Sequence, residues 1–225
     1  WVKVKAVYKA RWGLLGAYKK FILMFSILWS INLYAELFDD AHNEEKYGDA
    51  KKAAELYLES CNSENSNACY HLGMLYVEGE GVRQNNKKAG EFFVKACSDG
   101  NPDACFNLGL IYEDGRAVAK DKKKAIKFYE IACNGDSADG CFYLGKIYLK
   151  GKFLEQNYKK VIELYSKSCD LENKESCYSL GSMYLEGDGA RQNKNIAKEF
   201  FGKACDRGDN RGCKKFRLLS DAGIK

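Results

Sequence analysis

The ten cysteines of this 225-residue chain constrain its fold more than any other feature. They form five C-x7-C pairs, and each pair begins 36 residues after the one before it. An even number of cysteines at regular spacing is typical of a disulfide framework in a protein that reaches an oxidising compartment. We therefore expect five local bridges, which are Cys61–Cys69, Cys97–Cys105, Cys133–Cys141, Cys169–Cys177 and Cys205–Cys213.

Metal binding is the alternative use of these cysteines. The C-x7-C spacing differs from that of zinc-finger ligands, and His42 and His71 are the only histidines in the chain. We therefore expect neither a metal nor a cofactor, and we interpret both histidines as surface or packing residues.

The 36-residue period extends well beyond the cysteines. Leucine, glycine and tyrosine each recur in fixed columns, and a second glycine column follows the tyrosines. The four columns are Leu72, Leu108, Leu144 and Leu180; Gly73, Gly109, Gly145 and Gly181; Tyr76, Tyr112, Tyr148 and Tyr184; and Gly79, Gly115, Gly151 and Gly187. Self-similarity at this period indicates a stacked array of repeats.

Each repeat contains two helical patterns. In the pattern at 103–114, Cys105, Leu108, Gly109 and Tyr112 follow the i, i+3, i+4, i+7 spacing of one helix face. A glycine on that face disfavours a helix by roughly 1 kcal/mol, so its recurrence predicts a closely approaching neighbour. The pattern at 122–133 predicts a second helix. The fold class is therefore all-α, an α/α superhelical solenoid of helix pairs with one disulfide per repeat.

Lysines cluster at the start of the second helices, for example at 122–124 and 159–160. They indicate either a basic binding stripe or an ordinary solvated helix face. We favour the solvated face, because acids such as Glu130 and Glu163 share these helices.

The first 35 residues are typical of a secretory signal peptide. Six basic residues and no acids precede or border an apolar run at 21–33, which ends near the small residue Ala35. The run is shorter than the roughly 20 residues that a spanning helix needs, so we expect no membrane span after cleavage. An uncleaved anchor, which would make the protein a membrane-anchored periplasmic adaptor, is the alternative. We expect a secreted protein, either extracellular or periplasmic.

Cleavage would also remove the excess of positive charge from the chain. The whole chain carries a net charge of +5, and residues 1–35 contribute six positive charges, so 36–225 carries about 5 − 6 = −1. This gives no reason to expect a nucleic-acid partner. We divide the remaining chain into an N-terminal capping helix pair at 36–65, four repeats at 66–209 and a C-terminal capping helix at 210–225.

The repeats resemble Sel1-like repeats, which are relatives of the tetratricopeptide repeat. The segments that carry the resemblance are CYHLGMLYVEGEGV (69–82), CFNLGLIYEDGRAV (105–118), CFYLGKIYLKGKFL (141–154) and CYSLGSMYLEGDGA (177–190). With the C-x7-C pairs and the signal peptide, the closer resemblance is to the Helicobacter cysteine-rich proteins. That resemblance implies a penicillin-binding protein with weak β-lactamase activity, and a β-lactam or peptidoglycan-type ligand.

The residues themselves do not supply a β-lactamase site. In 36–225 no serine has a lysine three residues later, and the S-D-N and K-T-G motifs are absent. Two isolated histidines do not supply the ligand set of a metallo-β-lactamase. Whether the chain is an enzyme stays open, and its catalytic residues are unknown.

The function that we favour is a monomeric scaffold that binds a peptide or protein. Stacked helix pairs form a concave groove, and residues outside the packing columns would face a ligand. One such column is His71, Asn107, Tyr143 and Ser179. Its mixture of imidazole, amide, phenol and hydroxyl groups suits an extended peptide, although a surface without selected function would also vary in this way.

Overall fold

The structure is a computed structural model that describes residues 36–115 and 117–224, so the proposed signal peptide lies outside the described part. All regular secondary structure in those ranges is helical. A helical segment at 36–47 comes first. The labelled helices are α2 (Ala50–Asn62), α3 (Ser66–Glu78), α4 (Asn86–Ser98), α5 (Pro102–Asp114), α6 (Lys122–Asn134), α7 (Ala138–Lys150), α8 (Tyr158–Asp170), α9 (Lys174–Glu186), α10 (Lys194–Asp206) and α11 (Asn210–Asp221).

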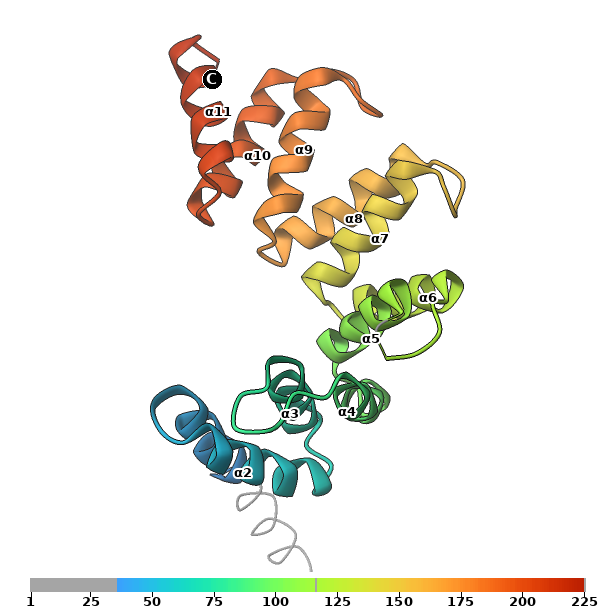
Figure 1. Cartoon of the computed structure of the whole chain (residues 1–225). Helices are drawn as coiled ribbons and strands as arrows, with labels where there is room; N and C mark the ends of the chain where they lie inside the picture. The colour runs from blue at the N-terminus through green and yellow to red at the C-terminus, as the bar shows by residue number, and fades with distance from the viewer. Residues whose placement is uncertain (1–35, 116, 225) are drawn as a thin grey trace, which may run out of the picture.

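The helices stack in chain order into a curved rod, with α11 at the end opposite to α2 (Figure 1). Each helix packs mainly against the helices before and after it in the chain. Local contacts of this kind define a solenoid, in which the stability of each repeat depends on its neighbours. The expectation of an all-α superhelical solenoid is confirmed.

Local sequence fixes where the helices begin and end. Each labelled helix follows an Asp, Asn or Ser whose side chain accepts a hydrogen bond from a backbone N–H of the first turn. Helices α3, α5, α7 and α9 end at a glycine in the left-handed conformation, where a side chain would be strained. These glycines are the second glycine column of the repeat.

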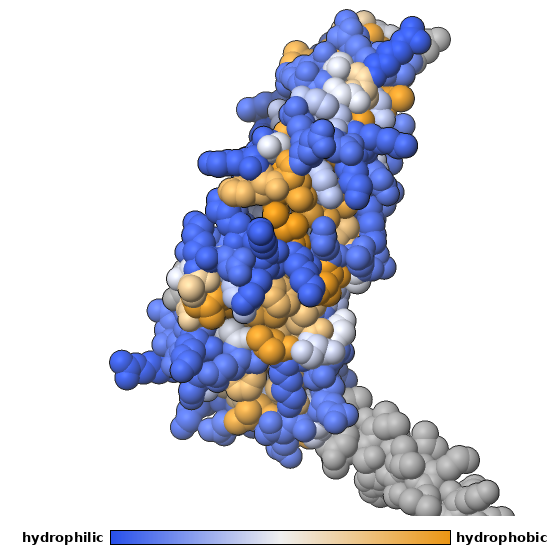
Figure 2. All heavy atoms as spheres, turned by 90° about the vertical axis from the view of Figure 1, so that its right-hand side faces the viewer, coloured by the Kyte–Doolittle hydropathy of each residue, from blue (hydrophilic) through white to orange (hydrophobic). Residues whose placement is uncertain are grey.

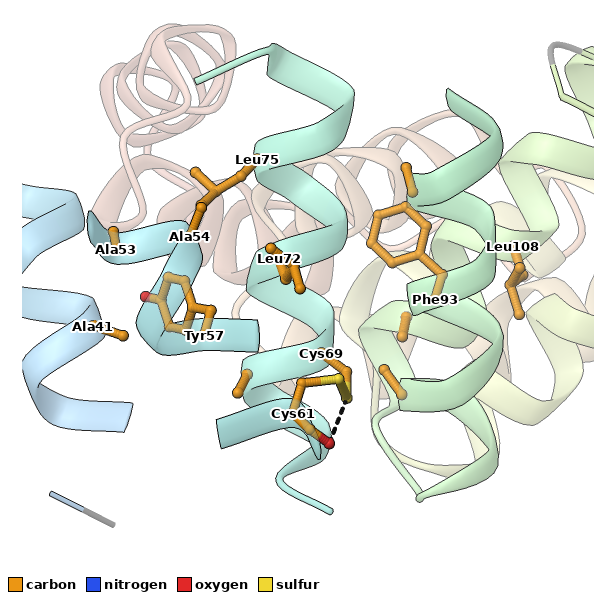
Figure 3. Packing of buried hydrophobic residues seen from close by; sticks show 14 residues of the cluster. Ala41, Ala53, Ala54, Tyr57, Cys61, Cys69, Leu72, Leu75, Phe93 and Leu108 are labelled. Carbon is orange, nitrogen blue, oxygen red and sulfur yellow. Dashed lines mark hydrogen bonds between the residues drawn. A yellow bond between two sulfur atoms is a disulfide. The ribbon is translucent and has the colours of Figure 1, made fainter. Parts of the chain in front are cut away.

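The first glycine column explains how the two helices of a repeat pack. An aromatic ring from the following helix lies directly on each of these glycines. A Cβ atom added to Gly73 would lie 2.6 Å from Cε1 of Phe93, so no larger residue fits there without displacement of the ring. Figure 3 shows Phe93 beside α3, within the buried cluster that also contains Leu72. The predicted close approach at these glycines is confirmed.

A disulfide joins each repeat to the next. The five bridges pair Cys61 with Cys69, Cys97 with Cys105, Cys133 with Cys141, Cys169 with Cys177 and Cys205 with Cys213. In each of them the Cα atoms lie 4.4 to 4.8 Å apart. This is at the short end of the usual range for disulfides, in which a separation of about 5.5–6 Å is most common.

Small residues account for the short separation. The residue before the second cysteine of each bridge is Ala68, Ala104, Gly140, Ser176 or Gly212, and all five are buried. A Cβ atom on Gly140 would lie only 2.6 Å from the Cβ atom of Ala132 on α6.

Because each bridge closes nine residues, restriction of the unfolded chain contributes roughly 2–3 kcal/mol per bridge.

Hydrogen bonds from the N-cap residue of one first helix to the first helix of the preceding repeat connect successive repeats. The side chain of Asn101 donates to Asn67 at 2.9 Å, and Ser137 donates to Asp103 at 2.8 Å. Asn173 and Asp139 form the next such contact at 2.8 Å. The residue that caps one first helix thus also fixes the position of the previous first helix.

Most of the lysines at the start of the second helices are exposed to solvent. One of them in each of three repeats lies over a ring of the tyrosine column, at 5.1 to 5.2 Å from the ring centroid. These are Lys88 over Tyr76, Lys124 over Tyr112 and Lys160 over Tyr148. A cation–π contact of this kind is worth about 0.5–1 kcal/mol at an exposed site, so these lysines have a structural use.

Candidate binding groove

Three adjoining pockets lie along the first helices in the middle of the rod. The middle pocket, of about 430 Å³, is lined by Asn107, Leu110 and Glu113 of α5 together with Tyr143 of α7. A second pocket, of about 220 Å³, shares Glu113 and Tyr143 with it. A third, of about 530 Å³, shares Asn107. We call the three pockets together the central groove.

The structure separates the four residues of the predicted groove column. Asn107 and Tyr143 line the same pocket of the central groove. Ser179 lies outside all three pockets, and its hydroxyl donates to the backbone oxygen of Glu175 at 2.7 Å. His71 also lies outside them and contacts Glu45 instead.

The two ends of the central groove carry opposite charges. Lys122, Lys146, Lys150 and Lys152 line the second pocket, and Asp103, Asp136 and Asp139 line the third. The acids lie near helix N-termini and Lys146 and Lys150 lie in the last turns of α7, so several of these charges also complement the helix macrodipoles. Figure 2 shows patches of apolar side chains among hydrophilic ones along one face of the rod.

Aromatic rings form one wall of the central groove. Phe106 contacts both Tyr143, at 5.0 Å between ring centroids, and Tyr129, at 5.7 Å. The Lys146 ammonium lies 4.6 Å from the Tyr143 centroid and 5.2 Å from that of Phe142. The sequence signal for this wall is a further column directly after the second cysteines, Tyr70, Phe106, Phe142 and Tyr178, of which Tyr70 and Phe106 line the central groove. Sequence reasoning missed it because the column is aromatic in every repeat, as a packing column would be, whereas ligand contacts were expected in variable columns.

Tyr129 and Glu113 make a hydrogen bond at the border of the groove. The buried phenol donates to Oε2 of Glu113 at 2.6 Å. Burial and the adjacent Glu113 carboxylate raise the pKa of Tyr129 far above its ordinary value, so the hydroxyl stays a donor. Burial alone raises the pKa of Tyr165, the equivalent residue of the next repeat, to about 12.

A second polar cluster lies at the N-terminal end of the rod. The Nδ1 atoms of His42 and His71 lie 3.4 Å and 3.3 Å from Oε2 of Glu45. The phenol of Tyr57 donates to the same oxygen at 2.5 Å. Burial is the main cause that lowers the pKa of His71, while the Glu45 carboxylate acts in the opposite direction. Sequence reasoning missed this cluster, because the two histidines are 29 residues apart (71 − 42) and Glu45 belongs to no repeated column.

The arrangement does not favour a serine hydrolase. Within 36–115 and 117–224, no serine hydroxyl hydrogen-bonds to a lysine or histidine side chain. A nucleophilic serine needs such a base within hydrogen-bond reach. None of the helices that the structure describes is long and apolar enough to span a membrane.

Solved structures of other proteins share this fold. A Sel1 repeat protein from Oxalobacter formigenes is 22% identical with a TM-score of 0.76, and the match covers 81% of this chain and 76% of that one. A protective antigen of uropathogenic Escherichia coli is 28% identical with a TM-score of 0.74 over 85% of this chain and 42% of the antigen, so this chain spans less than half of it. Helicobacter pylori cysteine rich protein B is 30% identical over 58% of this chain and 94% of that protein, with a TM-score of 0.48.

No curated protein matches the chain. The family model described as Sel1 repeat matches it four times, at residues 66–101, 102–137, 138–173 and 174–209. Repeats of this kind are typical scaffolds of protein–protein interaction, and five disulfides indicate an oxidising compartment. Since the four matches cover well over half of the sequence, the chain belongs to the Sel1 repeat family.

Proposed function

We propose that the chain is a secreted, monomeric Sel1 scaffold that binds an extended peptide or a protein segment in its central groove. The observation that carries this proposal is the continuity of three pockets through Asn107 and Tyr143. Residues 36–65 and 210–225 would close the two ends of the rod.

The lining of the groove favours a peptide that carries both signs of charge. A carboxylate of the peptide would lie among Lys122, Lys146 and Lys150, and a basic side chain would lie near Asp103 and Asp139. The Asn107 amide and the Tyr143 phenol would bind backbone groups between these two ends. The Asn107 nitrogen donates to the Asp103 backbone oxygen at 3.0 Å, which leaves its amide oxygen as an acceptor.

A random peptide library displayed on phage and selected against the purified, oxidised chain tests the proposal. We expect enriched peptides with an acid and a base several residues apart. Their affinity should fall at least tenfold for N107A/Y143A and should weaken with added salt. E130A is the matched control, because Glu130 is exposed on α6 outside the central groove, and this variant should bind like the wild type. Equal binding by N107A/Y143A would contradict the proposal.

Secretion is tested separately. Expression of the full chain in a bacterial host and N-terminal sequencing of the exported product should give Glu36 as the first residue. A product that keeps residues 1–35 and stays with the membrane would instead support the anchored adaptor.

A further inference from the structure

Two histidines and a glutamate converge at the N-terminal end of the rod. His42 and Glu45 come from the helical segment 36–47, and His71 comes from α3. One ligand atom from each lies within 4.8 Å of the ligand atoms of the other two. We call these three residues the histidine cluster. The central groove does not include it.

The distances fit a tetrahedral zinc ion. With metal–ligand bonds of about 2.0–2.1 Å, two ligand atoms of a tetrahedral zinc site are about 3.3 Å apart. Oxygen Oε2 of Glu45 lies 3.4 Å from Nδ1 of His42 and 3.3 Å from Nδ1 of His71. Two edges of the tetrahedron are therefore already in place, and the ligand atoms of the two histidines, which form the third, lie within 4.8 Å of each other.

The surroundings hold the ligands while leaving an entry path. The buried ring of Tyr57 stacks on His71 at 5.1 Å, and its hydroxyl hydrogen-bonds to Glu45. An outer contact of this kind orients a ligating carboxylate. The His42 side chain is 53% exposed, whereas those of His71 and Glu45 are 28% and 24% exposed. Solvent thus reaches the site from the side of His42.

We propose that His42, Glu45 and His71 form a zinc site with three protein ligands and a fourth position open to water or to a side chain of a bound partner. Two imidazoles and a carboxylate are ligands that zinc accepts, and a site with three protein ligands leaves the fourth position to water or another ligand. Such a site would replace our expectation that both histidines have only surface or packing roles. It would also join the N-terminal cap to the first repeat, because its ligands come from both.

Isothermal titration of the purified, oxidised full chain with zinc chloride tests the proposal. We expect one equivalent of zinc to bind, and the affinity to fall at least tenfold in H42A and in E45Q. His42 is the most exposed ligand, and the amide introduced by E45Q keeps an oxygen acceptor for Tyr57, so both variants should fold. The matched control is E44Q, because Glu44 is adjacent and pairs with Lys52 instead. This control should bind zinc like the wild type.

Thermal unfolding gives an independent readout. Zinc should raise the midpoint of unfolding of the wild type and of E44Q, because an ion that binds only the folded state stabilises it. It should leave the midpoints of H42A and E45Q unchanged, and without zinc all four proteins should show similar helical spectra. Zinc that binds H42A and E45Q as tightly as the wild type, or no binding to the wild type, would overturn the proposal.

Discussion

Two tyrosine–glutamate pairs occupy equivalent places in the rod and differ in what surrounds them. Tyr57 donates to Glu45 at 2.5 Å, and Tyr129 donates to Glu113 at 2.6 Å. The tyrosines are two periods apart (129 − 57 = 72). The glutamates are 68 residues apart (113 − 45), because 12 residues separate Glu45 from Tyr57 whereas 16 separate Glu113 from Tyr129. The connection before α2 is thus shorter than the one before α6.

The neighbours of the two pairs also correspond, position by position. A phenylalanine lies beside each tyrosine, as Phe38 at 5.8 Å from Tyr57 and Phe106 at 5.7 Å from Tyr129. The two remaining positions differ, and the corresponding residues are His71 with Tyr143 and His42 with Leu110. The repeat thus provides a carboxylate held by a buried phenol in both places. Two side chains decide whether that carboxylate belongs to a metal site or to an organic binding pocket.

The largest expected effect comes from the disulfide beside the interior pair. We expect C133A/C141A to lower the free energy of unfolding by about 2–3 kcal/mol, because the bridge no longer restricts the unfolded chain. The break lies in the middle of the rod, so chemical denaturation followed by circular dichroism should show a broadened or two-step transition. C61A/C69A, at the N-terminal pair, removes a bridge over a loop of equal length and should unfold one end of the rod first. A sharp single transition of unchanged midpoint in C133A/C141A would contradict this.

The next effect concerns the residue under each tyrosine, which is Gly109 in the interior and Ala41 at the N-terminus (109 − 41 = 68). A Cβ atom on Gly109 would lie 2.6 Å from Cδ1 of Tyr129, so G109A should cost about 2 kcal/mol through displacement of the ring.

Gly90 provides the control for this substitution. A Cβ atom there would meet only Cδ1 of Ile111, at 3.7 Å, so G90A should stabilise the chain by about 0.5–1 kcal/mol. Urea denaturation measures the stability of both variants. If G109A stabilised the chain, an alanine would fit under the tyrosine ring in the interior of the rod, as Ala41 does at the N-terminus.

A smaller effect distinguishes the two phenols. Y129F removes the hydrogen bond to Glu113, and no other hydrogen bond or ion pair of Glu113 exists among the described residues, so we expect a loss of about 1 kcal/mol. Y57F should cost about half of that, because both histidines remain beside Glu45. Equal losses in urea denaturation would mean that the histidines do not compensate for the missing hydroxyl.

The period of the sequence predicted the fold because every packing contact recurs with it. The glycine under each ring and the bridge at each junction repeat every 36 residues. A single sequence therefore shows that the same packing contact recurs in every repeat. The small residues beside the second cysteines repeat as well, but they vary between alanine, glycine and serine. The close approach of 4.4 to 4.8 Å at the bridges therefore became apparent only in the structure.

The candidate sites were harder to predict for the opposite reason. The predicted column of His71, Asn107, Tyr143 and Ser179 contains two residues of one pocket, because only these two lie where three pockets adjoin. His71 meets His42 through a helix that carries neither a cysteine nor the repeat motif. Contacts between a repeat and an irregular cap follow no period, so spacing alone does not reveal them.

The sharpest test of the comparison transfers the histidines to the interior pair. L110H/Y143H places imidazoles around Glu113 at the positions that His42 and His71 have around Glu45. Both positions are half-buried and Tyr143 packs against Phe106, so we expect a loss of about 1 kcal/mol in folding stability. If the repeat backbone is equivalent in both places, titration should show a second equivalent of zinc, and Y143H alone should not. Binding of only one equivalent by L110H/Y143H would mean that the shorter connection before α2, rather than the set of side chains, creates the zinc geometry.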